Sequence, residues 1–165
     1  MPALQEVLHE ENEEMKLWAI RTLKRIGVAA VPSLIQALQD KERAVKVYAI
    51  GALSEIGGPA AVSSLMEVLE SENEEWSIRD NAAEALGKIG DMAAVPGLIR
   101  ALSYNDESVR REAARALRQI GSNAVPQLVE ALRSTEGDLR RRITAQLRAI
   151  GTPEALSAVN TKSRH

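Results

Sequence analysis

Apolar residues recur along the chain with the three-and-four spacing of an amphipathic helix, and residues 106–132 display this pattern most completely. The apolar positions of the first half are Val109, Ala113, Ala116, Leu117 and Ile120. Asp106 or Ser108 can accept hydrogen bonds from the free N–H groups at the helix start, and Gly121 suits a left-handed residue after its end. Pro126 then fits the first turn of a second helix, whose apolar positions are Leu128, Val129 and Leu132. The segment therefore predicts two consecutive helices.

An Ile-Gly pair ends the first helix of each such unit and recurs at intervals of 30 to 33 residues. The pairs are Ile26-Gly27, Ile56-Gly57, Ile89-Gly90, Ile120-Gly121 and Ile150-Gly151. A Leu stands three residues before every Ile, and seven residues before it stand Ala19, Ala49, Ala82, Ala113 and Ile143, mostly a small side chain that lets two helices approach closely. Recurrence at this period predicts an all-α solenoid of about five helix pairs, formed by residues 1–165 as a single domain.

The two ends of the chain depart from the repeat. The apolar spacing of residues 2–9 matches that of residues 32–39, so we expect a partial helix at residues 2–10. Another helix begins after Gly151, but Lys162 occupies a position where the repeats have leucine, which predicts a polar capping helix at residues 153–162. The sequence leaves open whether the chain is a piece of a longer array and whether copies associate end to end.

Composition agrees with thin helical layers. The chain is 45% hydrophobic but only 2% aromatic, with no Phe and no Cys. The absence of cysteine excludes disulfides and thiolate metal sites. No apolar run approaches the roughly 20 residues that span a bilayer, and the N-terminus has no signal-peptide pattern, so we expect a soluble, cytoplasmic protein without a membrane partner.

The repeated motif resembles a known family. The spacing D-x-x-V-R-x-x-A-x-x-A-L-x-x-I-G, followed by A-V-P-x-L-x-x-A-L, resembles the HEAT-like repeat named after phycobilisome lyases. The resemblance covers essentially the whole chain. It implies a right-handed superhelix of helix pairs, in which the helices that end in Ile-Gly line the concave face.

The family pattern also places a basic residue after an aliphatic one in each of these helices. In this chain the basic residues are Lys16, Lys46, Arg79, Arg110 and Arg140. We expect them to link successive repeats through acidic residues near the helix starts, such as Glu42, Glu75, Asp106 and Glu136.

Helical phase selects the residues that point away from the apolar stripe. With about 100° per residue, positions two, five and nine before each Ile face outward, and position eight lies at the edge of the stripe. The candidate binding residues at these positions are Leu17, Trp18, Arg21, Lys24, Val47, Tyr48, Asp80, Glu84, Arg111, Arg115, Arg118, Arg141, Arg142 and Arg148. Trp18 and Tyr48 share one phase in adjacent repeats, so we expect them to lie near each other.

Charge is polarised along the array, with net −6 over residues 1–104 and net +4 over residues 105–165. The hypothesis is a non-catalytic scaffold whose concave groove binds a protein or peptide segment. Leu17, Trp18, Val47 and Tyr48 would form an apolar pocket, and the later arginines would meet acidic groups of the partner. In the alternative interpretation the aromatic residues fill gaps between layers and the arginines form a solvated face.

Other classes of function are less well supported by the residues. Deoxyhypusine hydroxylase, a HEAT-like enzyme, holds two irons with His-Glu pairs; here Arg111-Glu112 stands at the corresponding place, and the only histidines are His9 and His165. With no glycine-rich phosphate loop and no thiol or histidine relay, we expect no enzymatic activity and no cofactor. A phycobilin lyase subunit or chaperone remains an alternative by resemblance. The sequence pI near 5.8 argues against a nucleic acid partner.

Overall fold

The computed structural model describes residues 2–8 and 12–160, and every regular element in this part of the chain is helical. The described residues do not include His9 and His165. They also omit residues 9 and 10 of the first expected capping helix and residues 161 and 162, including Lys162, of the last. In chain order the elements are α1 (Pro2–Val7), α2 (Glu13–Ile26), η1 (Gly27–Ala30), α3 (Val31–Ala37), α4 (Arg43–Ile56), α5 (Pro59–Glu70), α6 (Trp76–Ile89), η2 (Met92–Ala94), α7 (Val95–Ala101), α8 (Glu107–Ile120), η3 (Gly121–Ala124), α9 (Val125–Ser134), α10 (Gly137–Ile150) and α11 (Pro153–Asn160).

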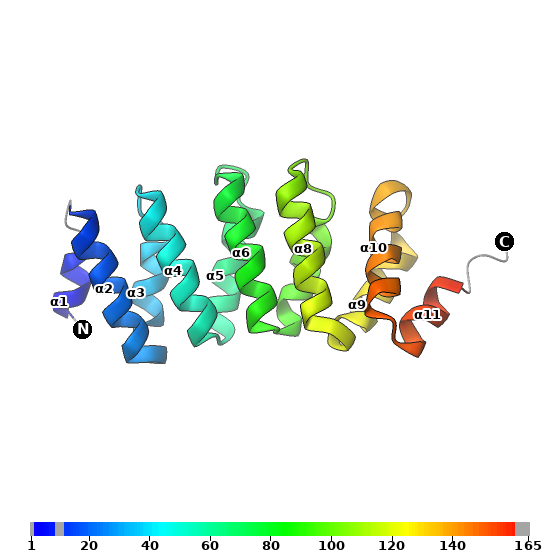
Figure 1. Cartoon of the computed structure of the whole chain (residues 1–165), viewed down its shortest axis with the longest axis horizontal. Coiled ribbons are helices and arrows are strands. Elements are labelled where there is room, and N and C mark those ends of the chain that lie inside the picture. Colours follow the sequence, from blue (N-terminus) through cyan, green and yellow to red (C-terminus); the bar gives the residue numbers. More distant parts are fainter. Residues whose placement is uncertain (1, 9–11, 161–165) are drawn as a thin grey trace.

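The helices stack in two layers, as Figure 1 shows. The Ile-Gly helices α2, α4, α6, α8 and α10 form one layer, and α3, α5, α7 and α9 form the second layer behind it. Contacts run between neighbours in the stack, and α1 and α11 lie at opposite ends. The predicted all-α solenoid is therefore confirmed.

The Ile-Gly pairs end the first helix of every repeat for one physical reason. Each glycine after the Ile has a positive φ between 67° and 78°, a region that side chains with a Cβ rarely adopt. Its backbone N–H donates to the carbonyl of the leucine three residues before the Ile, as from Gly57 to Leu53 at 2.8 Å. Gly90 and Gly151 are left-handed, whereas Gly121 has ψ −134°, so the predicted left-handed conformation at that position is wrong although φ is positive.

Links between paired helices show one departure from the repeat. Short 3-10 turns lead into α3, α7 and α9, each with proline in its first turn. Between α4 and α5 this turn is absent among the described elements, because Gly58 with φ 90° turns the chain and Pro59 starts α5 directly. Ser63, at the position where the other units have proline, consequently lies inside the helix.

The core runs along the stack between the two layers. Ala19, Ala49, Ala82 and Ala113 are fully buried, as expected for positions of close helix approach. The approach is tightest between α6 and α8, where a Cβ on Gly87 would lie 2.8 Å from Cα of Ala116. The close packing of these two helices requires glycine at position 87.

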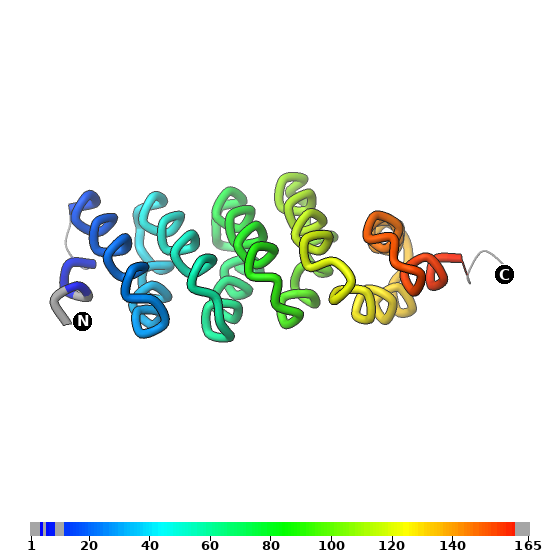
Figure 2. The backbone as a smooth tube through the Cα atoms, turned by 60° about the horizontal axis from the view of Figure 1, so that its bottom comes forward, coloured from blue at the N-terminus to red at the C-terminus, as the bar shows by residue number. Residues whose placement is uncertain are grey.

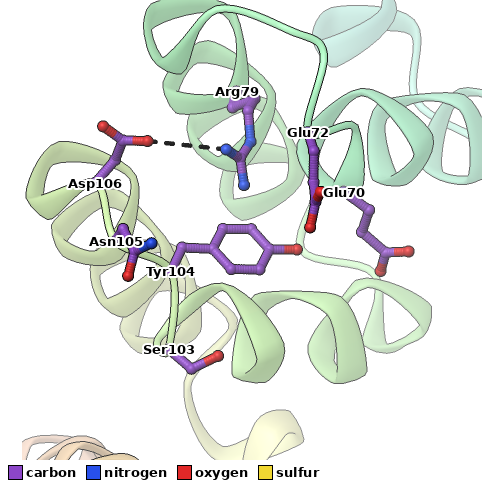
Figure 3. A pocket seen from close by; sticks show the side chains of 7 residues that line it. All are labelled: Glu70, Glu72, Arg79, Ser103, Tyr104, Asn105 and Asp106. Carbon is purple, nitrogen blue, oxygen red and sulfur yellow. Dashed lines mark ion pairs between the residues drawn. The ribbon is translucent and has the colours of Figure 1, made fainter.

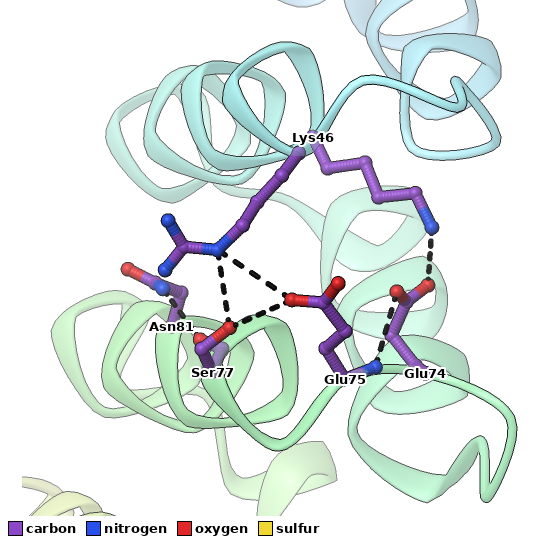
Figure 4. A network of polar contacts seen from close by, with 6 residues as sticks. Lys46, Glu74, Glu75, Ser77 and Asn81 are labelled. Atoms are coloured by element: carbon purple, nitrogen blue, oxygen red, sulfur yellow. Dashed lines mark hydrogen bonds and ion pairs between the residues drawn. The ribbon is translucent and has the colours of Figure 1, made fainter.

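We call the repeated basic residues Lys16, Lys46, Arg79, Arg110 and Arg140 the ladder. Its two lysines reach forward to the next loop. Lys16 Nζ lies 2.7 Å from Asp40 Oδ2. Lys46 Nζ lies 2.6 Å from Glu74 Oε2, as Figure 4 shows. Burial opposes ionisation of Asp40, but the hydrogen bond from Lys16, the backbone N–H of Glu42 and two nearby lysine charges outweigh it and lower the pKa of this carboxyl. Each lysine thus connects its own repeat to the following one.

The arginines of the ladder behave differently. Arg110 Nη1 donates to the carbonyl oxygens of Tyr104 and Asn105 in the loop just before α8. Arg140 donates to those of Leu132, in the last turn of α9, and Thr135, just after α9. Arg79 combines both modes, with Nε 3.0 Å from the Leu69 carbonyl and Nη1 3.8 Å from Asp106 Oδ2.

The expected carboxylate partners are therefore mostly wrong. Asp106 pairs with a ladder residue, and Glu75 pairs with Arg43, which is outside the ladder, at 3.6 Å. Glu42 and Glu136 form no ion pair with any described residue. The long side chains of the ladder residues reach past the helix starts to partners in loops. The loops do not repeat in sequence, so the repeat period could not predict these partners.

Candidate functional site

The exposed surface of α2, α4, α6, α8 and α10 carries the residues selected by helical phase, and we call it the Ile-Gly face. Most positions two, five and nine before each Ile are exposed or half-buried. Gly87 is the buried exception, because α8 covers it.

A hollow opens on this face between α2 and α4, and we call it the aromatic hollow. Its volume is about 490 Å³, and its lining consists of Ile20, Arg21, Lys24, Val47, Tyr48, Gly51, Ala52 and Glu55. Arg21 holds the aromatic ring in place: its Nη2 donates to the Tyr48 hydroxyl at 3.3 Å, and its Cζ lies 5.3 Å from the ring centroid. Lys24 Nζ lies 2.6 Å from Glu55 Oε1 at the rim. A Cβ on Gly51 would meet nothing within 4 Å, so the floor is open.

Two of the candidate residues lie outside this hollow. Leu17 is half-buried and packs against the core. Trp18 is 55% exposed, and within the described part of the chain it has no ring contact with Tyr48. The structure thus brings together Arg21, Lys24, Val47 and Tyr48, whereas Trp18 is an exposed side chain outside the lining of the hollow.

The centre of the Ile-Gly face is acidic. Asp80 and Glu84 on α6 lie close to Glu112 on α8. Ser108 Oγ donates to Asp80 Oδ1 at 3.0 Å, and Lys88 pairs with Glu84 at 2.7 Å. Burial raises the pKa of Glu112, and the neighbouring charges of Asp80 and Glu84 add to this, whereas Arg115 acts in the opposite direction. Glu112 was not among the predicted binding residues, although its phase equals that of Trp18 and Tyr48.

The six predicted arginines have unequal surroundings. Arg115 pairs with Glu112 at 3.7 Å, Arg118 donates to Gln146 at 2.8 Å, Arg141 pairs with Asp138, and Arg142 donates to the Leu102 carbonyl. Arg111 and Arg148 are exposed and have no hydrogen-bond or ion-pair partner among the described residues. These two keep their full capacity to bind an outside group.

A further hollow lies away from this face, at the loops before α6 and α8, and Figure 3 shows its side chains. Its lining consists of Glu70, Glu72, Arg79, Ser103, Tyr104, Asn105 and Asp106. Arg79 Cζ lies 4.4 Å from the Tyr104 ring centroid, and its nitrogens are already bonded to Leu69 and Asp106. The sequence period could indicate Arg79, but it gave no signal for the loop residue Tyr104.

Neither a metal centre nor a membrane-spanning helix is present within the described ranges. No group of three or more His, Cys, Asp or Glu side chains there is placed to hold a metal ion. None of the helices in the same part of the chain has the length and apolarity to cross a lipid bilayer.

These features define an α-solenoid repeat protein with a continuous face of paired-helix repeats. Residues 1–76 and 70–148 match the family model for HEAT repeats, and the chain belongs to this family. The predicted resemblance is thereby confirmed.

Two curated relatives are similar to parts of the chain. Phycocyanobilin lyase subunit alpha of Nostoc sp. strain PCC 7120 is 42% identical over 66 residues, which cover 37% of this chain and 24% of that protein. Deoxyhypusine hydroxylase of Eremothecium gossypii is 46% identical over 59 residues, which cover 36% of this chain and 18% of that protein. The chain therefore spans less than a quarter of either relative.

Solved structures share the fold over nearly the whole chain. Human deoxyhypusine hydroxylase matches with a TM-score of 0.68 and 25% identity, covering 95% of this chain and 65% of that one. The CpcE–CpcF complex of phycocyanin lyase from Nostoc matches at 0.52 and 23%, covering 96% and 80%. A designed armadillo repeat protein in complex with the peptide (KR)4 matches at 0.52 and 16%, covering 97% and 86%.

These similarities correct the expectation that the chain has no enzymatic activity. A curated relative and the solved structure with a TM-score of 0.68 are both deoxyhypusine hydroxylases, which are enzymes, and another relative is a lyase subunit. The expectation rested on the absence of short catalytic motifs. In a solenoid, the repeated positions are set by packing between layers, so the same repeat pattern serves enzymes and binding proteins alike.

Proposed function

We propose that the Ile-Gly face binds a segment of another protein, with the aromatic hollow as its anchoring point. The observation that carries this proposal is the exposed Tyr48 ring, which Arg21 fixes above an open, partly aliphatic floor. Trp, Tyr and Arg are the residue types enriched among those that carry most of the binding energy of protein interfaces. Trp18, outside the lining of the hollow, adds a second exposed aromatic side chain from α2.

Solenoids of this fold support the proposal. A designed armadillo protein with the same architecture is in complex with a peptide, and the phycocyanin lyase structure is a complex of two subunits. In this chain the alternation of aromatic, acidic and arginine-rich zones along one face fits an extended segment of matching charge pattern.

The test is affinity capture with a double substitution. We expect Trp18→Ala combined with Tyr48→Ala to reduce the amount of retained partner by about tenfold or more, since a hot-spot aromatic contributes about 2 kcal/mol. Both side chains are exposed, so helicity measured by circular dichroism should be unchanged. Captured proteins are identified by mass spectrometry and their binding to wild type is then measured directly.

Trp76→Ala is the matched control. Trp76 is 54% exposed, against 55% for Trp18, but it lies at the start of α6 and outside the aromatic hollow. Equal retention by wild type and the double variant, or an equal loss with Trp76→Ala, would remove the aromatic hollow as the anchor.

A second candidate function is that of a bilin lyase subunit, favoured by the 42% identity to phycocyanobilin lyase subunit alpha. Incubation of the protein with bilin and an apo-phycobiliprotein should then yield a covalent coloured adduct. Absence of any adduct, also when a second lyase subunit is supplied, speaks against this function.

A further inference from the structure

The junction between α8 and α10 is more open than the other junctions of the Ile-Gly layer. α6 and α8 pack closely, whereas α8 and α10 make few contacts, and Figure 2 shows α10 set apart from α8. Fully buried Ile143 occupies the position where the other repeats have alanine, so α10 cannot come as near. The sequence therefore creates a gap at this one place in the layer.

A hollow of about 350 Å³ remains there, and we call it the arginine hollow. It is lined by Leu102, Glu107, Arg110, Arg111, Ala114, Arg142 and Gln146. Three guanidinium groups thus border one small space, contributed by α8 on one side and α10 on the other.

Two of these arginines are held in fixed positions by backbone carbonyls. Arg142 Nη1 donates to the carbonyl of Leu102, the residue directly after α7, at 2.5 Å. Arg110 Nη1 donates to the Tyr104 carbonyl at 2.6 Å. The partial negative charge at the end of a helix favours this arrangement. An incoming ligand therefore does not have to order these two long side chains.

The three arginines of the hollow have no ion-pair partner in the described part of the chain. Arg110, Arg111 and Arg142 form no ion pair there, and Arg111 has no hydrogen-bond partner at all. Glu107 is the one acidic residue of the lining, and it pairs with none of the three. An anion in the hollow would relieve the mutual repulsion of three guanidinium groups.

We propose that the arginine hollow binds a dianionic phosphoryl group carried by the partner segment. A guanidinium presents parallel N–H donors that match oxyanion geometry, and a phosphoryl group brings about −1.5 to −2 charges with three acceptor oxygens. The part of this inference that concerns a carrier segment rests on the proposed function. The binding of free phosphate depends on the hollow alone.

The test is a titration of the whole chain with inorganic phosphate, followed by NMR at constant ionic strength with chloride as the balancing ion. We expect saturable shifts of the amides that line the hollow. Arg111→Gln should weaken phosphate binding by about tenfold, because it removes a charge-assisted hydrogen bond from an exposed side chain that supports no part of the fold. Glu107→Gln should strengthen it, because it removes the one negative charge of the lining.

Arg148→Gln is the control of equal charge change. Arg148 is exposed and without a partner in the described ranges, like Arg111, but it lies outside the hollow, so its replacement should leave the affinity unchanged. If Arg148→Gln weakens phosphate binding as much as Arg111→Gln does, or if the amide shifts do not saturate, the effect is general charge attraction. Either result would overturn the proposed site.

Two further comparisons distinguish phosphate binding in the arginine hollow from binding of a phosphorylated partner segment. A phosphoserine peptide that binds more tightly than inorganic phosphate supports a phosphorylated segment, whereas equal affinities overturn that part and leave a site for the free ion. If phosphate does not bind while the Trp18 and Tyr48 variant still loses its partner, the arginine hollow is refuted and the proposed function stands. The converse result refutes the proposed function together with the carrier segment, and it leaves the arginine hollow as a site for the free ion.

Discussion

At the scale of single residues, Glu112 shows how burial on the Ile-Gly face makes a carboxyl group harder to ionise. Its side chain is 14% exposed, and its Oε1 accepts no hydrogen bond within the described structure, although Arg115 lies 3.7 Å away. Burial raises the pKa of Glu112, with Asp80 and Glu84 adding to the shift. A carboxylate in this position is less well solvated than in the unfolded chain.

The raised pKa of Glu112 predicts a pH dependence of stability. Because the folded chain holds this proton more tightly than the unfolded chain, the stabilising effect is complete below the unfolded pKa and is lost as the pH rises through the folded pKa. Glu112→Gln should therefore raise the melting temperature at pH 7, by up to about 2 °C, and have little effect near pH 4.

Thermal unfolding followed by circular dichroism at both pH values measures this difference. Arg115→Gln provides the opposing case, because it removes the cation that lowers the pKa of Glu112 and should reduce stability at pH 7. A fall in melting temperature for Glu112→Gln at pH 7 would show that the pair with Arg115 outweighs the cost of burial.

At the scale of helices, the junction between α8 and α10 is the weakest link of the Ile-Gly layer. Few contacts join the two helices, and a hollow with three arginines lies between them. In a linear array each repeat depends on its neighbours, so a weak junction allows the part beyond it to open separately. We expect backbone amides of α10 and α11 to exchange hydrogen faster than those of α6 and α8.

Hydrogen–deuterium exchange with mass spectrometry resolves these segments. Ile143→Ala removes a fully buried side chain and should cost about 2 to 4 kcal/mol, accelerating exchange in α10 more than in α6. Uniform exchange along the chain, or equal acceleration in both helices, would indicate a single cooperative unit.

The ends of these helices also show what the sequence could predict. All five Ile-Gly positions end a helix as predicted, because the positive φ there is a local requirement on glycine. The repeat pattern does not indicate the start of α5 at Pro59, because Gly58 and Pro59 replace the usual turn and the proline no longer follows a valine. Asp40 and Glu74 were missed as ladder partners because they lie in loops, to which the repeat period does not extend.

At the scale of the whole molecule, the fold followed from the repeat period, but the site followed only in part. Phase alone placed Arg21, Lys24, Val47 and Tyr48 on one face, where the structure shows a shared hollow. Phase could not show that Tyr48 turns toward Arg21 rather than Trp18, because that depends on side-chain conformations and on the angle between repeats. Packing also defines the arginine hollow, through the larger side chain at position 143.

The direction in which the ladder cations reach has a consequence for rearranging the array. Lys16 and Lys46 pair with carboxylates of the following loops. Transplanting either unit without its successor would therefore leave a largely buried lysine without its ion-pair partner. Arg110 and Arg140 are satisfied by carbonyls from their own side of the chain. Because every residue carries a backbone carbonyl, units patterned on these two require no particular side chain in the neighbouring unit, and they could be duplicated or spliced to lengthen the array.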